Sequence, residues 1–371
     1  PRQFGERWKV EVEGREPVEL ESVSNSPRVF VIHGLFSEEE ADFLVTRALE
    51  RTGVNALKQS GVGFKTTGER DFMQTRTSAS AFDTESPEAL TLIKRSFEVL
   101  RIPYDYDQAD GLQILRYQPG EAYINHTDWF ELGADGFVHN FDPATPDGSN
   151  RWATVFFYLL TPPDGGQTVF PRAAIEEGMR NGEFVSLGDD AAARDAALGE
   201  ARKFFNGTTA WEYNLVDLCY SSLAVKPVRL GAALFYHQDP VTARLQPEAD
   251  HGACPSLGGT KWGANLWIWN RARHLTLDKG STKQVVATFK SRHAEPLVLE
   301  FSMDGGTSWS FFATIQPGQS HSAYTYAGHL WRLATERDRR TVRDWTVPAE
   351  ANNPVVESLT GDERTKPSDE L

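Results

Sequence analysis

The sequence predicts a mainly β protein with flanking helices, followed by a second and smaller β-domain. Two helix signals lie before residue 101, and six short stretches rich in β-branched and aromatic residues follow between residues 112 and 269. Gly, Pro and Asp bound these stretches, as they do in strands joined by turns. This order favours an antiparallel barrel or sandwich that is supported by helices. Another strand-rich block begins near Val285 and predicts the small β-domain.

The first predicted elements are a strand and two helices. The strand covers 29–32, and Ser37 with Glu40 then forms a capping box that opens an amphipathic helix ending near Leu49. Ser86 and Pro87 begin the second helix, which runs towards residue 100. The six strands that follow span 112–117, 153–160, 168–170, 223–225, 232–236 and 265–269. Residues 173–203 are rich in Ala, Glu, Asp and Arg, which is typical of a surface helical insertion.

Composition excludes several classes of protein. With 371 residues, 40% hydrophobic and 24% charged, the chain has ordinary globular composition and room for two domains. Its net charge of -14, from 52 acidic and 38 basic residues, argues against a nucleic-acid partner, which requires a basic face. No apolar run approaches the ~20 residues that a membrane helix requires. Because the chain starts at Pro1 without a signal-like stretch, we expect a processed or trimmed N-terminus.

These patterns divide the chain into three parts, 1–280, 281–347 and 348–371. Gly-rich hairpin signals at 304–306 and a last strand near Trp345 define the second part. The third part has few apolar residues and predicts a flexible tail. It ends in Ser-Asp-Glu-Leu, which is similar to the KDEL-type signal that retains proteins in the endoplasmic reticulum lumen.

Two cysteines and a glycosylation sequon bear on the same compartment. Cys219 and Cys254 lack the CxxC spacing of a zinc site, so they form either one disulfide or two free thiols. The sequon at Asn206 and the tail favour the endoplasmic reticulum lumen, where a Cys219–Cys254 disulfide would be expected. The alternative is a polar acidic tail on a cytosolic protein.

Two histidines and one carboxylate are the candidate metal ligands. In an extended chain His126 and Asp128 project to the same face, so both can bind one ion. The third ligand is His251, far downstream, or His237, which also follows a strand. Two His and one carboxylate form the facial triad of non-haem Fe(II) oxygenases, which leaves three positions for the co-substrate and O2. Lys261, ten residues after His251, offers a cation for a dicarboxylate.

Seven motifs in order extend this pattern across roughly residues 28–272. They are 76–78 (RTS), 113–123 (QILRYQPGEAY), 126–128 (HTD), 150–154 (NRWAT), 165–171 (GGQTVFP), 223–227 (LAVKP) and 251–255 (HGACP) with Lys261, Trp262 and Trp267. With these motifs the chain resembles the 2-oxoglutarate- and Fe(II)-dependent prolyl 4-hydroxylase family, close to its collagen and plant cell-wall branch. The resemblance implies a double-stranded β-helix (jelly-roll) core and makes 1–280 the catalytic domain.

The resemblance also implies the metal ligands. Fe(II) would be bound by His126, Asp128 and His251, because the family's distal histidine directly precedes Gly-x-Cys-Pro. His237 then becomes a satisfied structural or rim histidine. Asn125 begins a second sequon, but a glycan there would block the metal site, so we expect Asn125 to be unmodified.

The remaining site residues follow from the same resemblance. 2-Oxoglutarate would chelate the metal, and its buried distal carboxylate, which needs a cation and donors, would be held by Lys261, Thr168 and Tyr117. The peptide groove would contain Tyr123, Arg151 and Trp267. The alternative for the two aromatic residues is a plain packing role. O2 is the co-substrate and ascorbate a further cofactor.

The small domain 281–347 looks like the β-domain of the von Hippel-Lindau tumour suppressor, which reads 4-hydroxyproline. The step from Gly318 to His329 matches, and the corresponding pocket would consist of Thr325, Tyr326, His329 and Trp331. Two positions depart from the pattern, since Thr325 replaces a Ser and Phe312 replaces a Tyr whose hydroxyl bonds the ligand. The domain is therefore either a reader that retains hydroxylated product or a packing or substrate-docking module.

The expected function is 4-hydroxylation of peptidyl proline in proline-rich or collagen-like secretory proteins, with release of succinate and CO2. This is an activity of the procollagen-proline 4-dioxygenase type, located in the endoplasmic reticulum lumen. One alternative is an oxygen-sensing prolyl hydroxylase of a signalling protein, although that branch usually carries Arg where this chain has Lys261. Another is a hydroxyproline-binding module with weak or no catalysis.

Overall fold

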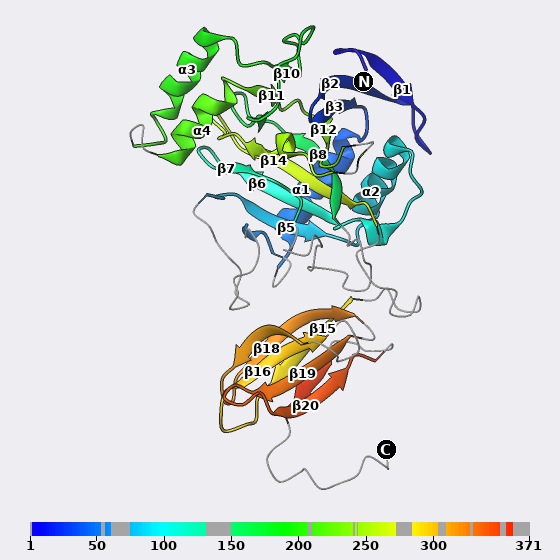
Figure 1. Cartoon of the computed structure of the whole chain (residues 1–371), viewed down its shortest axis with the longest axis vertical. Coiled ribbons are helices and arrows are strands. Elements are labelled where there is room, and N and C mark those ends of the chain that lie inside the picture. Colours follow the sequence, from blue (N-terminus) through cyan, green and yellow to red (C-terminus); the bar gives the residue numbers. More distant parts are fainter. Residues whose placement is uncertain are drawn as a thin grey trace. The chain divides into compact units, whose positions relative to one another are not determined.

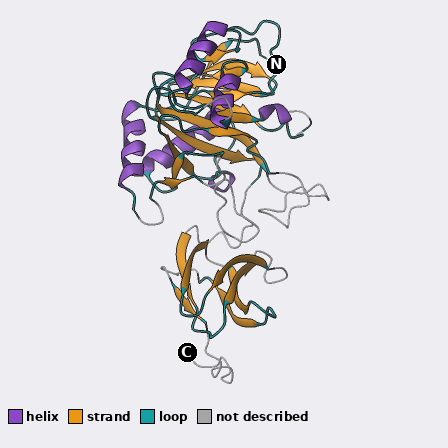
Figure 2. Cartoon of the chain, turned by 90° about the vertical axis from the view of Figure 1, so that its left-hand side faces the viewer, coloured by secondary structure: helices purple, strands orange, loops and turns teal. Residues whose placement is uncertain are grey.

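The structure is a computed structural model that describes residues 2–52, 56–60, 75–130, 150–206, 210–239, 242, 244–271, 284–302, 309–326, 329–348 and 354–358. Over these residues the chain is mostly β, as predicted (Figure 2). It divides into two compact units: of the described residues, those up to residue 271 belong to the first unit and those from residue 284 to the second (Figure 1).

Two sheets and four helices form the first unit within the described residues. The helices are α1 Glu38–Glu50, α2 Pro87–Leu100, α3 Ala191–Ala201 and α4 Trp211–Cys219. The larger sheet has the order β1-β2-β3-β12-β8-β14-β6-β5-β4. Its strands are β1 Arg7–Val10, β2 Val18–Asn25, β3 Arg28–His33, β4 Lys58–Gln59, β5 Ala79–Asp83, β6 Leu112–Tyr117, β8 Arg151–Leu160, β12 Gly231–Tyr236 and β14 Lys261–Trp269.

The smaller sheet of this unit has the order β10-β11-β9-β13-β7. Its strands are β7 Tyr123–His126, β9 Thr168–Phe170, β10 Val185–Ser186, β11 Leu223–Val225 and β13 His251–Ala253. Side chains of β6, β8 and β12 from the larger sheet share one buried apolar cluster with side chains of β9, β10 and β11 from the smaller sheet. The two sheets therefore face one another, in agreement with the predicted jelly roll.

Side-chain alternation along the strands separates two cores. On β8, Val155 and Phe157 point to a cluster that includes α1 and α2, whereas Phe156 and Tyr158 point into the space between the sheets. This period of two is what a strand buried on both faces requires. As a consequence, every second residue of β6, β8, β12 and β14 reaches the interior where the candidate site lies.

Both helices predicted before residue 101 are present with the predicted start signals. The Ser37 hydroxyl accepts from the backbone N–H of Glu40, and the Glu40 carboxylate accepts from the backbone N–H of Ser37, which completes the capping box of α1. Ser86 caps α2, with Pro87 at its first turn. The six strands predicted between 112 and 269 are also present.

Several elements of the first unit differ from the prediction. Strands β1, β2, β4, β5, β10 and β13 were not predicted. In β1 and β2 the apolar residues alternate with charged ones, a strand pattern that sequence reasoning missed. In the segment 173–203, only Ala191–Ala201 is helical. The residues before it include strand β10, which pairs with β11, and the turn at Gly188 needs glycine because its φ is +75° and a Cβ there would lie 2.3 Å from the backbone of Ser221.

Cys219 and Cys254 form a disulfide, as predicted for an oxidising compartment. Cys219 is the last residue of α4, and Cys254 directly follows β13. Both are buried. The bond therefore attaches the strand that begins with His251 to a helix that packs beside it.

The second unit is a β-sandwich in the described residues, as predicted. Its sheets have the orders β18-β15-β21 and β17-β16-β19-β20. The strands are β15 Gln284–Lys290, β16 Leu297–Ser302, β17 Ser310–Ile315, β18 Ser320–Tyr326, β19 Leu330–Thr335, β20 Thr341–Thr346 and β21 Val355–Glu357. Both sheets contribute to one apolar core around Phe289, Leu299 and Trp331.

The prediction of a flexible tail over 348–371 is wrong for residues 355–357, which form strand β21. Val355–Glu357 pairs in parallel with β15, and the side chain of Val356 is buried in the sandwich core. The Ser358 hydroxyl also accepts from the backbone N–H of Arg292. One buried valine in an otherwise polar segment gave too weak a pattern for a strand prediction. The Ser-Asp-Glu-Leu end and the hairpin signal at 304–306 lie outside the described residues.

Among the described residues, no helix combines the length and apolarity needed to cross a membrane.

Candidate active site

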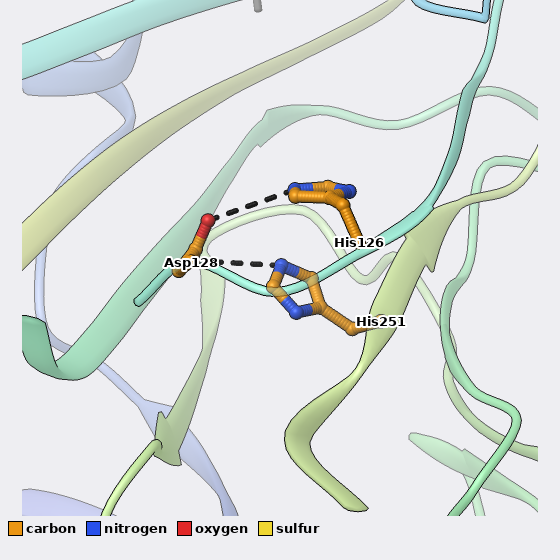
Figure 3. A group of neighbouring side chains, drawn as sticks. All are labelled: His126, Asp128 and His251. Carbon is orange, nitrogen blue, oxygen red and sulfur yellow. Dashed lines mark ion pairs between the residues drawn. The ribbon is translucent and has the colours of Figure 1, made fainter. Parts of the chain in front are cut away.

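His126, Asp128 and His251 lie side by side in the first unit (Figure 3). His126 ends β7, His251 begins β13, and the two strands pair antiparallel with these residues opposite each other. The Nε2 atoms of His126 and His251 lie 3.6 Å and 3.5 Å from the carboxylate of Asp128. The three ligand atoms lie within 4.8 Å of one another, and no other such His, Cys, Asp or Glu group occurs in the described part of the chain.

Backbone carbonyls fix the orientation of both imidazoles. Nδ1 of His126 lies 2.9 Å from the Ile124 carbonyl, and Nδ1 of His251 lies 3.0 Å from the Ala249 carbonyl. Because a carbonyl only accepts, each Nδ1 carries the proton and each Nε2 presents a lone pair towards Asp128. Sequence reasoning expected such partners but could not name them, since main-chain carbonyls leave no residue-type signal.

Burial shapes the charges of the three residues. It lowers the pKa of His251 to about 4, so this imidazole is neutral at neutral pH. Burial alone would raise the pKa of Asp128, but the imidazoles of His251, His126 and His237 outweigh it and hold this pKa well below its usual range. Two imidazoles and one carboxylate, brought together by β7 and β13, are the donor set that Fe(II) takes in a facial triad.

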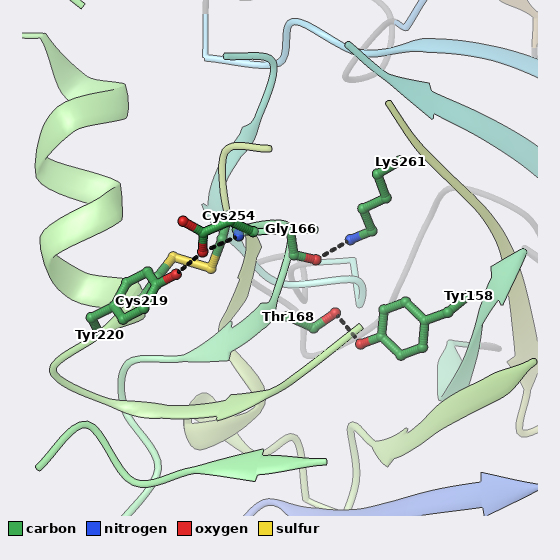
Figure 4. The surroundings of a disulfide bond; sticks show 9 residues. Tyr158, Gly166, Thr168, Cys219, Tyr220, Cys254 and Lys261 are labelled. Carbon is green, nitrogen blue, oxygen red and sulfur yellow. Dashed lines mark hydrogen bonds between the residues drawn. A yellow bond between two sulfur atoms is a disulfide. The ribbon is translucent and has the colours of Figure 1, made fainter. Parts of the chain in front are cut away.

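Lys261 is a fully buried cation in the same interior (Figure 4). Its Nζ donates to the Gly166 carbonyl at 2.7 Å and lies 4.7 Å from the centre of the Phe156 ring. No carboxylate of the described residues pairs with it, and burial lowers its pKa to about 7. A buried ammonium without an anion is costly, so the site fits a ligand that brings a carboxylate, as 2-oxoglutarate does.

The other residues predicted for 2-oxoglutarate lie near Lys261. The Tyr117 ring centre is 5.3 Å from Nζ, and Thr168 is buried on β9. Sequence reasoning missed Tyr158, whose hydroxyl lies 2.8 Å from the Thr168 hydroxyl. The sequence places Tyr158 at the same parity on β8 as Thr154, but its pairing with Gly263, two residues after Lys261, is evident only from the structure.

The predicted groove residues surround the other side of the triad. Tyr123 stacks on His126 with ring centres 3.7 Å apart, and Arg151 lies over the Trp267 ring at 3.9 Å. Arg151 also pairs with Asp110 and donates to the backbone carbonyl of Asp128. Asp110, which follows no motif, was not predicted. The Trp267 indole N–H is buried and has no partner in the described residues, unlike the N–H of a satisfied core tryptophan.

His237 was predicted to be a satisfied structural or rim histidine; its burial contradicts a rim position, and only one of its two ring nitrogens has a partner in the described residues. Its side chain has no exposed surface, and its Nδ1 atom has no partner in the described residues. Its Nε2 lies 2.7 Å from the Thr154 hydroxyl, which in turn donates to Asp128 at 2.7 Å.

In the second unit, three of the four predicted reader residues lie together. The Thr325 hydroxyl accepts from the Trp331 indole N–H at 2.8 Å and lies 3.2 Å from Nδ1 of His329. Thr325 and Trp331 are buried, whereas His329 is partly exposed. The side chain of Tyr326 lies outside the described residues.

The structure describes the whole of the Asn125 sequon but only the first residue of the Asn206 sequon. Asn125 is exposed, and its side-chain amide donates to Asp250 at 2.9 Å. This bond joins the residue before His126 to the residue before His251. Residues 207 and 208 of the Asn206 sequon lie outside the described residues.

A family model supports this geometry. Residues 112–269, which contain the triad and Lys261, match the model of the 2OG-Fe(II) oxygenase superfamily. The chain is also 30% identical over 250 residues to probable prolyl 4-hydroxylase 3 of Arabidopsis thaliana, covering 67% of this chain and 71% of the relative. The chain belongs to the prolyl 4-hydroxylase family. Fe(II) and 2-oxoglutarate are the cofactors of such oxygenases, and ascorbate is typical of prolyl 4-hydroxylases.

Other prolyl 4-hydroxylases show similar matches. Prolyl 4-hydroxylase 5 of Arabidopsis thaliana is 29% identical over 266 residues, which cover 71% of this chain and 72% of the relative. Among solved structures, the viral collagen prolyl hydroxylase of Paramecium bursaria Chlorella virus-1 aligns with a TM-score of 0.39 and 21% identity, over 65% of this chain and 95% of that one.

Replacing Lys261 tests the binding of 2-oxoglutarate. Lys261→Ala should raise the 2-oxoglutarate concentration needed for half-maximal turnover about 10- to 100-fold, because a charge-assisted hydrogen bond contributes roughly 1.5–3 kcal/mol. Calorimetric titration with Co(II) should show nearly unchanged metal binding. Lys226→Ala is the matched control, since Lys226 also donates to a glycine carbonyl but lies outside the site. An unchanged 2-oxoglutarate requirement would contradict the assignment of Lys261.

Proposed function

We propose that the protein 4-hydroxylates peptidyl proline in proline-rich or collagen-like proteins of the secretory pathway. The observation that carries the proposal is the pairing of a His126–Asp128–His251 triad with the buried, anion-free cation of Lys261 in one interior. The triad suits Fe(II), and Lys261 suits the distal carboxylate of 2-oxoglutarate. The family membership of the chain supports hydroxylation of proline.

The protein's own residues would bind the metal and 2-oxoglutarate, orient the peptide and exclude water from the site. When bound, Fe(II) and 2-oxoglutarate supply the oxidation of a C–H bond by O2, with succinate and CO2 as co-products. His126, Asp128 and His251 would hold the metal, and a set of three protein ligands would leave room for the co-substrate and O2. Lys261 and the Thr168–Tyr158 pair would fix the far end of 2-oxoglutarate. Tyr123, Arg151 and Trp267 border the same centre and would position the peptide.

The donors of the groove suit a peptide backbone. The Trp267 N–H is buried without a partner, and a peptide carbonyl would satisfy it. The Arg151 guanidinium is held by Asp110, so its remaining N–H groups have a fixed direction. Tyr123 presents an aromatic ring next to His126, where a proline ring could pack. A proline residue has no backbone N–H and therefore needs no acceptor from the protein, which agrees with a groove that consists of hydrogen-bond donors and aromatic rings.

A turnover assay tests this function. Incubation with Fe(II), 2-oxoglutarate, ascorbate and proline-rich peptides should release succinate and add one oxygen to proline, as measured by mass spectrometry. His251→Ala should abolish both signals because the triad loses one of its three ligands. His33→Ala is a control for loss of a histidine outside the site. Succinate release without proline oxidation, or full activity of His251→Ala, would contradict the proposal.

We further propose that the protein works in the endoplasmic reticulum lumen. The buried Cys219–Cys254 disulfide supports this location, because disulfides persist in oxidising compartments and are rare in the cytosol. Lys261 supports the secretory branch over the oxygen-sensing one. Fractionation of the source cells, with an antibody against this chain, should recover it with luminal marker proteins. Recovery in the cytosol with Cys219 and Cys254 reduced would contradict the location.

For the second unit we propose binding of hydroxyproline-containing product. The cluster of a hydroxyl, an imidazole and an indole at Thr325, His329 and Trp331 supports this function. Because Thr325 is buried and already accepts from Trp331, the partly exposed His329 would make the contact with the ligand hydroxyl. Such a module would keep a partly modified chain near the catalytic centre.

Peptide binding by the metal-free protein tests the second unit. A hydroxyproline peptide should bind more tightly than its proline counterpart, as measured by calorimetry. His329→Ala should remove the difference, because it removes the group that would contact the hydroxyl. His293→Ala, in the same unit, should keep the difference. Equal affinity for both peptides would show that the unit is a packing or docking module.

A further inference from the structure

His237 is a buried imidazole next to a metal ligand that the triad itself does not use. It directly follows β12, and its backbone N–H donates to the Trp152 carbonyl at 2.8 Å, which holds it beside β8. The rings of Phe235 and Trp129 lie 5.4 Å and 6.1 Å from its own. The imidazole is therefore fixed in place and completely enclosed.

The hydrogen bonds from His237 to Asp128 have only one consistent direction. Asp128 is a carboxylate and can only accept, so the single proton of the Thr154 hydroxyl points to its Oδ2, 2.7 Å away. The same hydroxyl oxygen lies 2.7 Å from Nε2 of His237 and must accept there. Nε2 therefore carries the proton. Nδ1, which is buried and has no partner among the described residues, is then the unprotonated nitrogen of a neutral ring.

We propose that His237 is a positioning residue for the metal ligand Asp128, acting through Thr154. Its Nε2–H fixes the Thr154 hydroxyl, which would otherwise be able to rotate away from Oδ2. With Oδ2 engaged, the carboxylate cannot turn about its Cβ–Cγ bond. Oδ1 then stays 3.6 Å from Nε2 of His126, and Oδ2 stays 3.5 Å from Nε2 of His251, so the carboxylate keeps its place beside both imidazoles of the triad. Such partners of a ligand commonly affect metal affinity as well as ligand geometry.

The burial of His237 agrees with this role. The ring packs against Phe235 and Trp129 and has no exposed surface, so water does not compete for its bond to the Thr154 hydroxyl. A leucine of similar size would fill the space but would not donate to Thr154.

Metal affinity of three variants tests the proposal. Anaerobic calorimetric titration of Co(II) in the presence of 2-oxoglutarate should give a Kd about 10- to 100-fold higher for His237→Leu than for the unchanged protein. His237→Gln, whose amide can donate the same hydrogen bond, should restore most of the affinity. Thr154→Val should resemble His237→Leu, and the double variant should be no weaker than the poorer single variant, because both changes break one chain of hydrogen bonds.

The controls separate this inference from the assignments on which it rests. It relies on Asp128 as a metal ligand, so absence of Co(II) binding by the unchanged protein would refute the metal site itself. Normal binding by the unchanged protein and by His237→Leu would overturn only the role of His237. Equal losses in His237→Leu and His237→Gln would also overturn it, since packing alone would explain them. His33→Leu, outside the site, and circular dichroism of each metal-free variant control for folding.

Discussion

The first unit depends on two charges buried in the space between its sheets. Asp128 and Lys261 are both almost fully buried, yet no ion pair joins them. Removing such charges from water is costly unless partners are supplied. Asp128 receives donors from Thr154 and stands among three imidazoles, whereas Lys261 has one carbonyl and three aromatic rings. A metal cation at Asp128 and an anionic co-substrate at Lys261 would complete the two centres, and Fe(II) and 2-oxoglutarate, the cofactors of the family, carry these charges.

Strand geometry explains why one interior can contain both centres. Alternation on β8 and β14 sends Thr154, Tyr158, Lys261 and Trp267 to one face, while their neighbours build the core beneath α1 and α2. The triad instead comes from the ends of β7 and β13 in the opposite sheet. The disulfide at Cys254 anchors the strand of His251, so the ligands stand on rigid elements.

Much of this arrangement could be predicted from the sequence, because the metal ligands and Lys261 are chemically distinctive and their spacing is informative. The capping box at Ser37 and the six strands between residues 112 and 269 could also be predicted from the sequence. The roles of Tyr158, Asp110 and His237 could not be predicted, since they depend on which distant strands become neighbours. The carbonyls of Ile124 and Ala249 leave no sequence signal at all. Strand β21 was missed because one buried valine in a polar segment does not make a pattern.

A crystal structure of the protein with Mn(II) and 2-oxoglutarate would test the central claim most directly. The account predicts that the oxo-acid end chelates a metal bound by His126, Asp128 and His251. It also predicts that the distal carboxylate lies within hydrogen-bond distance of the Lys261 Nζ. A distal carboxylate bound by another cation such as Arg151, with Lys261 still lacking an anion, would contradict it.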